Sequence, residues 1–216
     1  MARQTEAVAV LGSGGHALVA VSTLQAQGRN VQGIFDDAPG SWGKELLGVP
    51  VRGPISAALE SGCSHAIIAI GDNATRRRIA EELPLQWTTA VHPFSSVHPG
   101  VRLGEGTVVF AGSIVQPGAD IGAHVILNTK ASVDHHCRVG DYAHIAVAHL
   151  GGGASIGKGV FMALGCIVLP GIYVGDWATV GAGAVVTRNV EAGLTVVGVP
   201  ARAREAKHAE DQRAHS

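Results

Sequence analysis

The sequence predicts a small α/β, Rossmann-like half-domain followed by a left-handed parallel β-helix built from six-residue repeats. Two observations carry this prediction. Strand-like and helix-like segments alternate up to about residue 90, and from residue 97 to residue 186 an aliphatic residue recurs every six positions. A fixed period takes precedence over local propensity because it identifies a repeat architecture. The repeating positions are Val97, Leu103, Val109, Val115, Ile121, Leu127, Val133, Val139, Ile145, Ile156, Met162, Val168, Val174, Val180 and Val186.

The segments of residues 1–90 indicate a parallel sheet with helices on its faces. Buried strands are predicted at 7–11, 31–35 and 66–70, an apolar helix from a glycine-rich turn to about residue 26, a short helix at 54–60, and a basic, exposed helix at 73–83. We expect the α/β domain to cover residues 1–90 and the β-helix residues 91–200. A polar tail, as a short helix or a frayed end, is expected at residues 201–216.

A period of six matches neither the 3.6-residue repeat of a helix nor the two-residue repeat of a strand. It is typical of short flat faces that meet at tight corners, where glycine and small side chains fit. Three faces make a triangular coil, and about five coils fit between Val97 and Val190. Small residues occur four positions after many of the aliphatic ones, and Cys137 and Cys166 at this position are expected to be core fillers.

The repeat slips once, because Ile145 and Ile156 are one residue short of two periods apart. A regular solenoid tolerates irregularity mainly where a loop or a ligand requires it. His135, His136 and His144 precede three consecutive glycines at 151–153, and a solenoid core does not need imidazoles at this density. The sequence therefore places the active site here. His149, at a core-type position inside the slip, is open to packing or to cofactor contact.

The glycine-rich turn resembles a dinucleotide fingerprint, since Gly12, Gly14 and Ala17 fit G-x-G-x-x-G/A and Asp36 follows at the expected distance. The α/β unit is only half the size of a dinucleotide fold, however. Backbone amides at a helix N-terminus bind any phosphate, and a carboxylate after the second strand accepts hydrogen bonds from a ribose or a base. A nucleotide-sugar diphosphate is the favoured ligand; a dinucleotide and a purely structural turn are the alternatives.

Composition argues against several classes of protein. The 16 basic and 17 acidic residues create no field that would attract nucleic acid or an anionic membrane. No apolar run is long enough to span a bilayer, and the N-terminus does not resemble a signal peptide. The three cysteines lack metal-ligand spacing. We expect a cytoplasmic protein without a metal.

Ordered motifs then give the whole chain a resemblance to the bacterial sugar O-acyltransferases of the sialic-acid O-acetyltransferase type. Within them, it is most similar to the acetyl-CoA-dependent N-acetyltransferases of nucleotide-linked 4-amino sugars, from the bacillosamine and perosamine pathways. The motifs are Gly12-Ser13-Gly14-Gly15-His16, Asp36-Asp37, Ile70-Gly71-Asp72-Asn73, Val91-His92-Pro93, Ile126-Leu127-Asn128-Thr129, Val133-Asp134-His135-His136-Cys137, Gly140-Asp141-Tyr142-Ala143-His144-Ile145 and Gly198-Val199-Pro200-Ala201. The resemblance implies a homotrimer, a nucleotide-linked amino sugar held by the α/β domain, and acetyl-CoA in the groove between neighbouring β-helices.

The resemblance also implies roles for individual residues. His135 matches the general base that deprotonates the sugar amine, and a neutral imidazole suits that task near neutral pH. His144 matches a contact of the thioester region. Candidate cofactor-binding glycines are Gly153, Gly165 and Gly183. Candidate substrate-binding residues are Ser13, Gly14, Gly15, Asp36, Asp37, Gly71, Asn73 and Asn128.

One position departs from the family pattern. Relatives carry an acidic residue directly after the catalytic histidine, where it orients the ring, whereas this chain has His136. Either Asp134 or Asp141 supplies the missing carboxylate, or the base is tuned differently. We therefore group His135, His136 and Asp134 as catalytic candidates.

Three other functions remain open on the sequence. An O-acetyltransferase acting on sialic acid or a related sugar would use the same base. A γ-class carbonic anhydrase shares the β-helix and binds zinc through three histidines; His144 and His149 match one pair, but no third histidine lies near Val109. A non-catalytic sensor would bind the nucleotide sugar and have no affinity for CoA.

Overall fold

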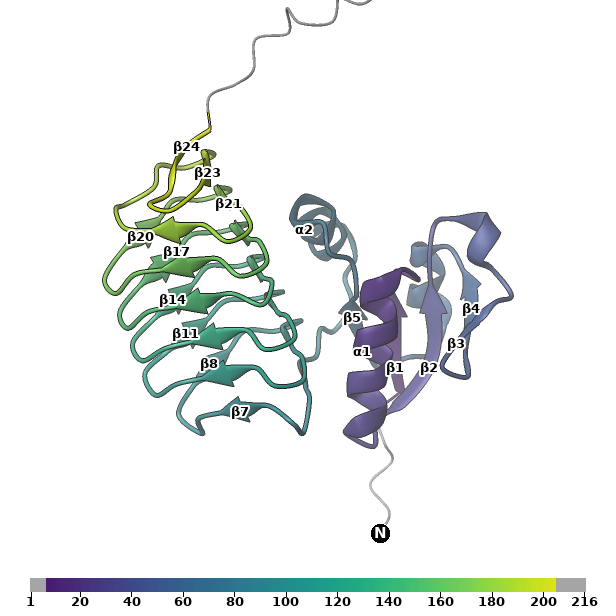
Figure 1. Cartoon of the computed structure of the whole chain (residues 1–216). Helices are drawn as coiled ribbons and strands as arrows, with labels where there is room; N and C mark the ends of the chain where they lie inside the picture. Colours follow the sequence, from purple (N-terminus) through teal and green to yellow (C-terminus); the bar gives the residue numbers. More distant parts are fainter. Residues whose placement is uncertain (1–6, 205–216) are drawn as a thin grey trace, which may run out of the picture.

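The computed structural model describes residues 7–204, in which an α/β unit stands beside a three-sided β-helix (Figure 1). The α/β unit contains β1 (Ala7–Leu11), α1 (Gly15–Ala26), β2 (Asn30–Phe35), the 3₁₀ turn η1 (Pro39–Ser41), β3 (Glu45–Leu46), β4 (Val49–Gly53), the 3₁₀ turn η2 (Ile55–Glu60), β5 (His65–Ile68) and α2 (Asn73–Glu82). Its sheet has the order β3-β4-β2-β1-β5, parallel except for the β3–β4 pair. The predicted α/β fold class is confirmed.

Two features of this unit differ from the prediction. The β3–β4 hairpin was not expected, and it extends the sheet by two short strands beyond β2. Helix α2 was expected to be exposed, but its Arg76 side chain is only 1% exposed and Asn73 is also buried. The burial arises because α2 packs against the β-helix, a contact that residue type alone does not reveal.

The β-helix has three faces, which we number in chain order. Face 1 contains β6 (Ala90–Val91), β9 (Val108–Val109), β12 (Ile126–Leu127), β15 (His144–Ile145), β18 (Phe161–Met162), β21 (Thr179–Val180), β23 (Thr195–Val197) and β24 (Arg202–Ala203). Face 2 contains β7 (Ser96–Val97), β10 (Ile114–Val115), β13 (Ser132–Val133), β16 (His149–Leu150), β19 (Ile167–Val168) and β22 (Val185–Val186). Face 3 contains β8 (Arg102–Leu103), β11 (Asp120–Ile121), β14 (Arg138–Val139), β17 (Ser155–Ile156) and β20 (Tyr173–Val174).

Every strand of the β-helix pairs in parallel with the strand one coil away, apart from the antiparallel closing pair β23–β24. The structure is a left-handed parallel β-helix, as predicted. We call the three edges corner 1/2, corner 2/3 and corner 3/1 after the faces they join. Of the predicted tail, Arg202–Ala203 form β24, and residues 205–216 lie outside the described part of the chain.

The six-residue period corresponds to one buried aliphatic side chain per strand. These side chains fill the β-helix core together with small corner residues, including Cys137 and Cys166 as predicted. Corner glycines allow the coils to stack closely: a Cβ on Gly140 would lie 2.5 Å from the carbonyl carbon of Gly157 in the next coil. A larger residue there would separate the two coils.

The slip in the period lies at corner 1/2 between β15 and β16. This corner has only Ala146, Val147 and Ala148, whereas the preceding coil uses four residues, 128–131, at the same place. Leu150 consequently takes the buried aliphatic position and pairs with Val133 and Val168. His149 was expected at a core-type position, but it is exposed on face 2 because the shortened corner shifts the register by one residue.

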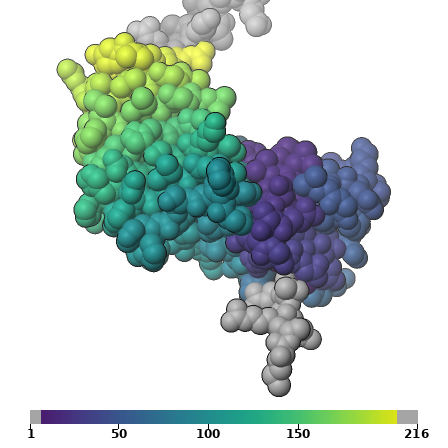
Figure 2. All heavy atoms as spheres, turned by 60° about the horizontal axis from the view of Figure 1, so that its bottom comes forward, coloured from purple at the N-terminus to yellow at the C-terminus, as the bar shows by residue number. Residues whose placement is uncertain are grey.

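The α/β unit packs on face 1. One buried cluster contains Leu24 of α1, Val108 of β9 and Ile126 of β12, and the space-filling view shows the purple atoms of the unit abutting the teal atoms of the β-helix (Figure 2). Corner 2/3 is the corner opposite face 1, so it lies on the far side of the β-helix from the α/β unit. Among residues 7–204, no helix is long and apolar enough to cross a membrane.

Candidate active site

The carboxyl ends of β1, β2 and β5 bring the glycine-rich loop and Asp36 together. Ser13 donates two hydrogen bonds to Asp36 Oδ2, from its backbone N at 2.6 Å and from its Oγ at 2.7 Å, and Ala38 N donates to Oδ1 at 2.8 Å. Partial burial acts to raise the pKa of Asp36, but these hydrogen bonds outweigh it and leave the pKa lowered. Asp36 is therefore a carboxylate that holds the loop in shape.

The loop leads into an open helix N-terminus. Gly14 is the N-cap of α1, with no side-chain cap and no acidic residue in the first turn. A Cβ on Gly14 or Gly15 would meet no atom within 4 Å, so space is free above the amides. Gly12 has a positive φ of 103°, which makes the turn possible. Unpaired amides at a helix N-terminus attract phosphate groups.

Two predicted substrate-binding side chains are engaged with the protein itself. Asn73 donates from Nδ2 to Gly159 O at 3.0 Å and accepts from Arg76 at Oδ1, and it is 8% exposed. Its amide joins the α/β unit to the β-helix. Asn73 also lines a crevice together with Gly71 and Phe161, and its contact with a substrate stays a prediction. Asp37 Oδ1 accepts a hydrogen bond from Ile55 N at 2.9 Å at the start of η2, while the rest of the side chain is exposed.

His144 lies on β15 at the junction of the two units. Its Nε2 is 3.1 Å from Asn128 Nδ2, and its Nδ1 is 3.4 Å from Gly71 O. Asn128 Oδ1 accepts from Thr129 N, so Nδ2 is the donor to His144 and the imidazole carries its proton on Nδ1. Burial, followed by smaller effects of His16 and Arg76, lowers the pKa of His144 to about 3. The ring is therefore neutral throughout the physiological range.

Two aromatic rings pack near His144, and two of its contact residues line a crevice. The His16 ring, at the start of α1, is 5.1 Å from that of His144, and the Phe161 ring is 5.3 Å away. Gly71 and Phe161 also line a crevice of about 340 Å³ between the α/β unit and face 1. The structure thus places His144 and Asn128 beside the nucleotide loop. His16 was missed as a site residue, although it belongs to the glycine-rich motif.

His135 and His136 lie at corner 2/3, between β13 and β14, and both are exposed. Their Nδ1 atoms are 3.1 Å apart, so one ring donates to the other. The His135 ring rests on Gly152, where a Cβ would lie 2.5 Å from Nε2. The Nδ1 atom of His135 is thus engaged with His136, which leaves its Nε2 atom for a substrate.

Within residues 7–204 of one chain, neither candidate carboxylate forms a hydrogen bond with the His135 ring. Asp134 Oδ1 accepts from the backbone N of His135 at 2.7 Å. Asp141 Oδ1 accepts from Ala123 N at 2.9 Å and belongs to corner 3/1. Asp134 therefore shapes the corner backbone, and Asp141 stabilises a different corner.

The candidate cofactor-binding glycines border face 2. Gly153 is at corner 2/3, while Gly165 and Gly183 are at corner 1/2, all three with positive φ and with no atom within 4 Å of an added Cβ. Face 2 and its corners also expose large apolar side chains, with Leu164 62% and Phe94 79% exposed. Others are Ile114, Val147, Ile167 and Leu169. Face 2 is thus an open, apolar surface that is flanked by His135.

The three-histidine metal hypothesis finds no geometric support. His144 lies on face 1 and His149 on face 2, so the two side chains leave the β-helix in different directions. Within residues 7–204, no three His, Cys, Asp or Glu side chains are grouped so that they could hold a metal ion.

A glycine-rich phosphate loop joined to a hexapeptide β-helix with exposed corner histidines defines a class, the hexapeptide-repeat acyltransferases with an N-terminal nucleotide-binding unit. Comparison with known proteins supports it. Residues 7–83 match the PglD N-terminal domain family. The crystal structure of PerB from Caulobacter crescentus, in complex with CoA and GDP-perosamine, is 38% identical, with a TM-score of 0.87, and the match covers 92% of this chain and 97% of that one. The chain belongs to the nucleotide amino-sugar N-acetyltransferases of the hexapeptide-repeat family.

Three further relatives are informative. The acetyltransferase domain of PglB from Neisseria gonorrhoeae, in complex with acetyl coenzyme A, is 34% identical with a TM-score of 0.86, covering 93% of this chain and all of that one. The UDP-N-acetylbacillosamine N-acetyltransferase of Bacillus subtilis is 35% identical over 110 residues, 48% of this chain and 51% of the relative. A serine acetyltransferase of Buchnera aphidicola is 28% identical over 64% of this chain and 46% of the relative. The chain thus spans about half the length of these curated relatives.

Proposed function

We propose that the protein transfers an acetyl group from acetyl-CoA to the amine of a nucleotide-linked 4-amino-4-deoxy sugar. One observation carries the proposal: a single chain combines an open phosphate loop, shaped by Asp36, with an exposed histidine pair beside an apolar face. Relatives that match nearly the whole chain bind CoA with GDP-perosamine, or acetyl coenzyme A. These relatives favour an amine over the alcohol acceptor of a sialic-acid O-acetyltransferase.

In the proposed reaction, His135 is the general base. The sugar amine attacks the thioester carbonyl carbon, and a C–N bond forms as the amine proton passes to His135 Nε2. The tetrahedral intermediate then collapses, the C–S bond breaks, and the imidazolium returns the proton to the leaving thiolate. His144 is too buried and too weakly basic for this step, since its pKa of about 3 leaves it almost no tendency to take a proton near neutral pH. Its proposed role is to line the site beside Asn128.

The two halves of the proposed site lie on opposite sides of one chain. The nucleotide loop and His144 border face 1, whereas His135 is at corner 2/3. We therefore propose that His135 of one protomer serves the nucleotide loop of its neighbour in a homotrimer. Closed cyclic symmetry provides this arrangement. The exposed apolar side chains of face 2 would be covered by the neighbour, with the pantetheine arm passing Gly153, Gly165 and Gly183.

The experiment that tests the proposal is a panel of UDP-, GDP- and dTDP-linked 4-amino sugars with acetyl-CoA, in which free-thiol release is followed. Release that depends on one of these sugars supports the proposal. Activity only with sialic acid would favour O-acetylation instead. Binding of a nucleotide sugar without any CoA affinity would indicate a sensor. We also propose a cytoplasmic location, because the three cysteines are free thiols.

Asp36→Ala is expected to raise the KM for the nucleotide sugar by about 10- to 100-fold, with a much smaller change in kcat. A KM change of this size corresponds to the loss of hydrogen bonds to a charged group. The change releases Ser13 and the loop but leaves the reacting groups in place. Steady-state kinetics with each substrate varied would measure it, with the exposed Glu60→Ala of the same unit as control. An unchanged KM with a lowered kcat would place Asp36 in the chemistry and contradict its assignment.

His136→Glu is expected to move the acidic limb of the kcat/KM profile to higher pH. The base must be neutral to act, and a carboxylate beside it favours the protonated ring, so protonation begins at a higher pH. Asp134→Asn and Asp141→Asn are the controls, and they should scarcely move the limb, because both carboxylates bond backbone amides. A limb that moves only in one of these two variants would assign the orienting carboxylate to that residue. Insensitivity to all three would exclude His135 as the titrating base.

A further inference from the structure

Arg76 on α2 is a buried cation whose hydrogen-bond acceptors are all uncharged. Its guanidinium donates from Nε to His124 O at 2.8 Å, from Nη1 to Ile70 O at 2.9 Å, and from Nη2 to Tyr142 O at 2.6 Å. Longer bonds reach Gly71 O and Ala143 O, and Nη2 also donates to Asn73 Oδ1. Within residues 7–204, no carboxylate lies at ion-pair distance from it. Burying a charge in this way is costly unless every donor is satisfied.

These acceptors belong to both units of the molecule. Ile70 and Gly71 follow β5 in the α/β unit, whereas His124 and Tyr142 are the corner 3/1 residues of two successive coils. Both corner residues have positive φ, 53° and 59°. Asn73 extends the contact to Gly159 O in a third coil. Helix α2 therefore holds three stacked corners of the β-helix through two side chains.

The same network continues to His144. The Gly71 carbonyl accepts from Arg76 Nη1 at 3.3 Å and from His144 Nδ1 at 3.4 Å. Gly71 is also fixed from its other side, because the His16 ring occupies the space where a Cβ would lie. Two partners select the tautomer of His144: Gly71 O accepts from Nδ1, and Asn128 Nδ2 donates to Nε2. Movement of the carbonyl would remove the first of them. The carbonyl is thus the link between the domain contact and the tautomer of His144.

We propose that Arg76 is a positioning residue that locks the α/β unit onto the β-helix and, through the Gly71 carbonyl, fixes the tautomer of His144. The lock presents the nucleotide loop in a constant position relative to face 1. Its contribution to catalysis rests on the proposed acetyl transfer, while the lock and the tautomer do not. Nothing in the basic pattern of α2 distinguishes Arg76 from Arg77 and Arg78; only the packing does.

The test uses Arg76→Met, which keeps the length of the side chain and removes the donors. In the full-length protein without substrates, we expect faster amide hydrogen exchange in α2 and at corner 3/1. The ¹⁵N signals of His144, assigned by comparison with His144→Asn, should change from one tautomer to a mixture. With substrates, kcat should fall on the order of 10²-fold, the effect of a small misplacement of reacting groups, while the KM for acetyl-CoA stays within about two-fold because its surface is distant.

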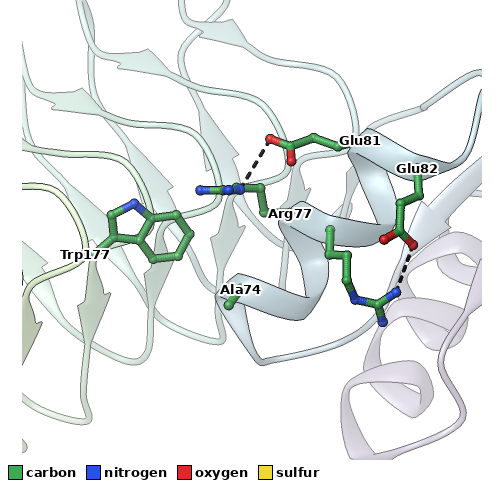
Figure 3. Close-up of a pocket in the computed structure, with 6 residues that line it drawn as sticks. Ala74, Arg77, Glu81, Glu82 and Trp177 are labelled. Atoms are coloured by element: carbon green, nitrogen blue, oxygen red, sulfur yellow. Dashed lines mark hydrogen bonds and ion pairs between the residues drawn. The ribbon is translucent and has the colours of Figure 1, made fainter.

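Arg77→Met is the matched control. Arg77 is the next residue of the same helix, but its guanidinium lies 5.4 Å from the Trp177 ring centroid and pairs with Glu81 on the outer side (Figure 3). It lines a surface pocket of about 490 Å³ and has no link to Gly71. This variant should keep the exchange pattern, the His144 signals and the kinetics of the wild type. Arg76→Lys keeps the charge and part of the donor set, so it should restore the His144 tautomer in part.

If Arg76→Met does not fold, Arg76→Lys and Asn73→Ala carry the test, since each removes only some of the contacts. The proposal is overturned if a folded Arg76 variant shows wild-type exchange at corner 3/1 and an unchanged His144 tautomer. A protein that shows both expected spectroscopic changes but acetylates no amino sugar would contradict the proposed function alone. The two failures are therefore distinguishable.

Discussion

Replacing His135 with alanine is expected to lower kcat/KM by about 10²- to 10⁴-fold, the usual contribution of a general base. The ring is exposed at corner 2/3, and the contacts of His135 that support the fold come from its backbone. Its carbonyl accepts from Gly153 N at 2.8 Å, and its N donates to Asp134 Oδ1 at 2.7 Å. The β-helix should therefore fold as in the wild type. Thiol release from acetyl-CoA with the preferred amino sugar measures the effect, and circular dichroism checks the fold.

His136→Ala is the comparison for this result. Its ring contacts His135 Nδ1 at 3.1 Å and rests against Gly118. In the proposed mechanism His136 orients the base but does not receive the proton, so its removal should lower kcat/KM much less than the removal of His135. If instead His135→Ala stays within a few-fold of wild type and His136→Ala is severely impaired, the base is His136.

The β-helix was predictable because the same packing requirement recurs in every coil. Each coil needs one aliphatic side chain per face and small residues at the corners, so the six-residue period survives local noise. The slip was also visible, but its consequence was not: Leu150 and His149 are neighbours, and only the strand pairing shows which one faces the core. The β3–β4 hairpin was missed because β3 has only two residues, and β4 contains Pro50 and ends at Gly53, two residue types that are depleted in strands.

The candidate site was predictable only where local geometry creates it. The glycine-rich turn and Asp36 come together at the carboxyl edge of a parallel sheet, which follows from topology. Asn73 and Arg76 belong to a motif and to a basic helix, and their neighbours are corner carbonyls far along the chain. Every residue has a backbone carbonyl, so the residue types do not show which carbonyl a side chain will contact, and such contacts cannot be inferred from the sequence. The family resemblance left open whether Asp134 or Asp141 supplies a carboxylate to His135 or whether the base is tuned differently, and the structure pairs the His135 ring with His136.

If the protein forms the proposed trimer, two inactive variants are expected to restore each other's activity when they share one. Gly15→Asp places a carboxylate at the open N-terminus of α1, where a Cβ meets no atom within 4 Å, so the fold should tolerate it. The added negative charge should repel the diphosphate and abolish use of the nucleotide sugar at low concentration. His135→Ala removes the base on the other side of the β-helix. Refolding the two variants together, in equal amounts, mixes them within trimers.

If the base and the loop of one site come from different protomers, random mixing of the two variants should give about one quarter of the wild-type rate, because each site needs an intact base and an intact neighbour. If they come from the same chain, the mixture stays inactive, and the trans arrangement is wrong. The double variant, with both changes in one chain, is the matched control. Mixed equally with wild type, it should leave about one quarter of the rate in the trans arrangement and about one half in cis. The trans arrangement thus gives a higher rate than cis in the first mixture and a lower rate in the second. Failed subunit exchange would leave separate trimers, and the rates would then be those of the cis arrangement. Mixing tagged and untagged wild-type chains in parallel shows whether subunits exchange.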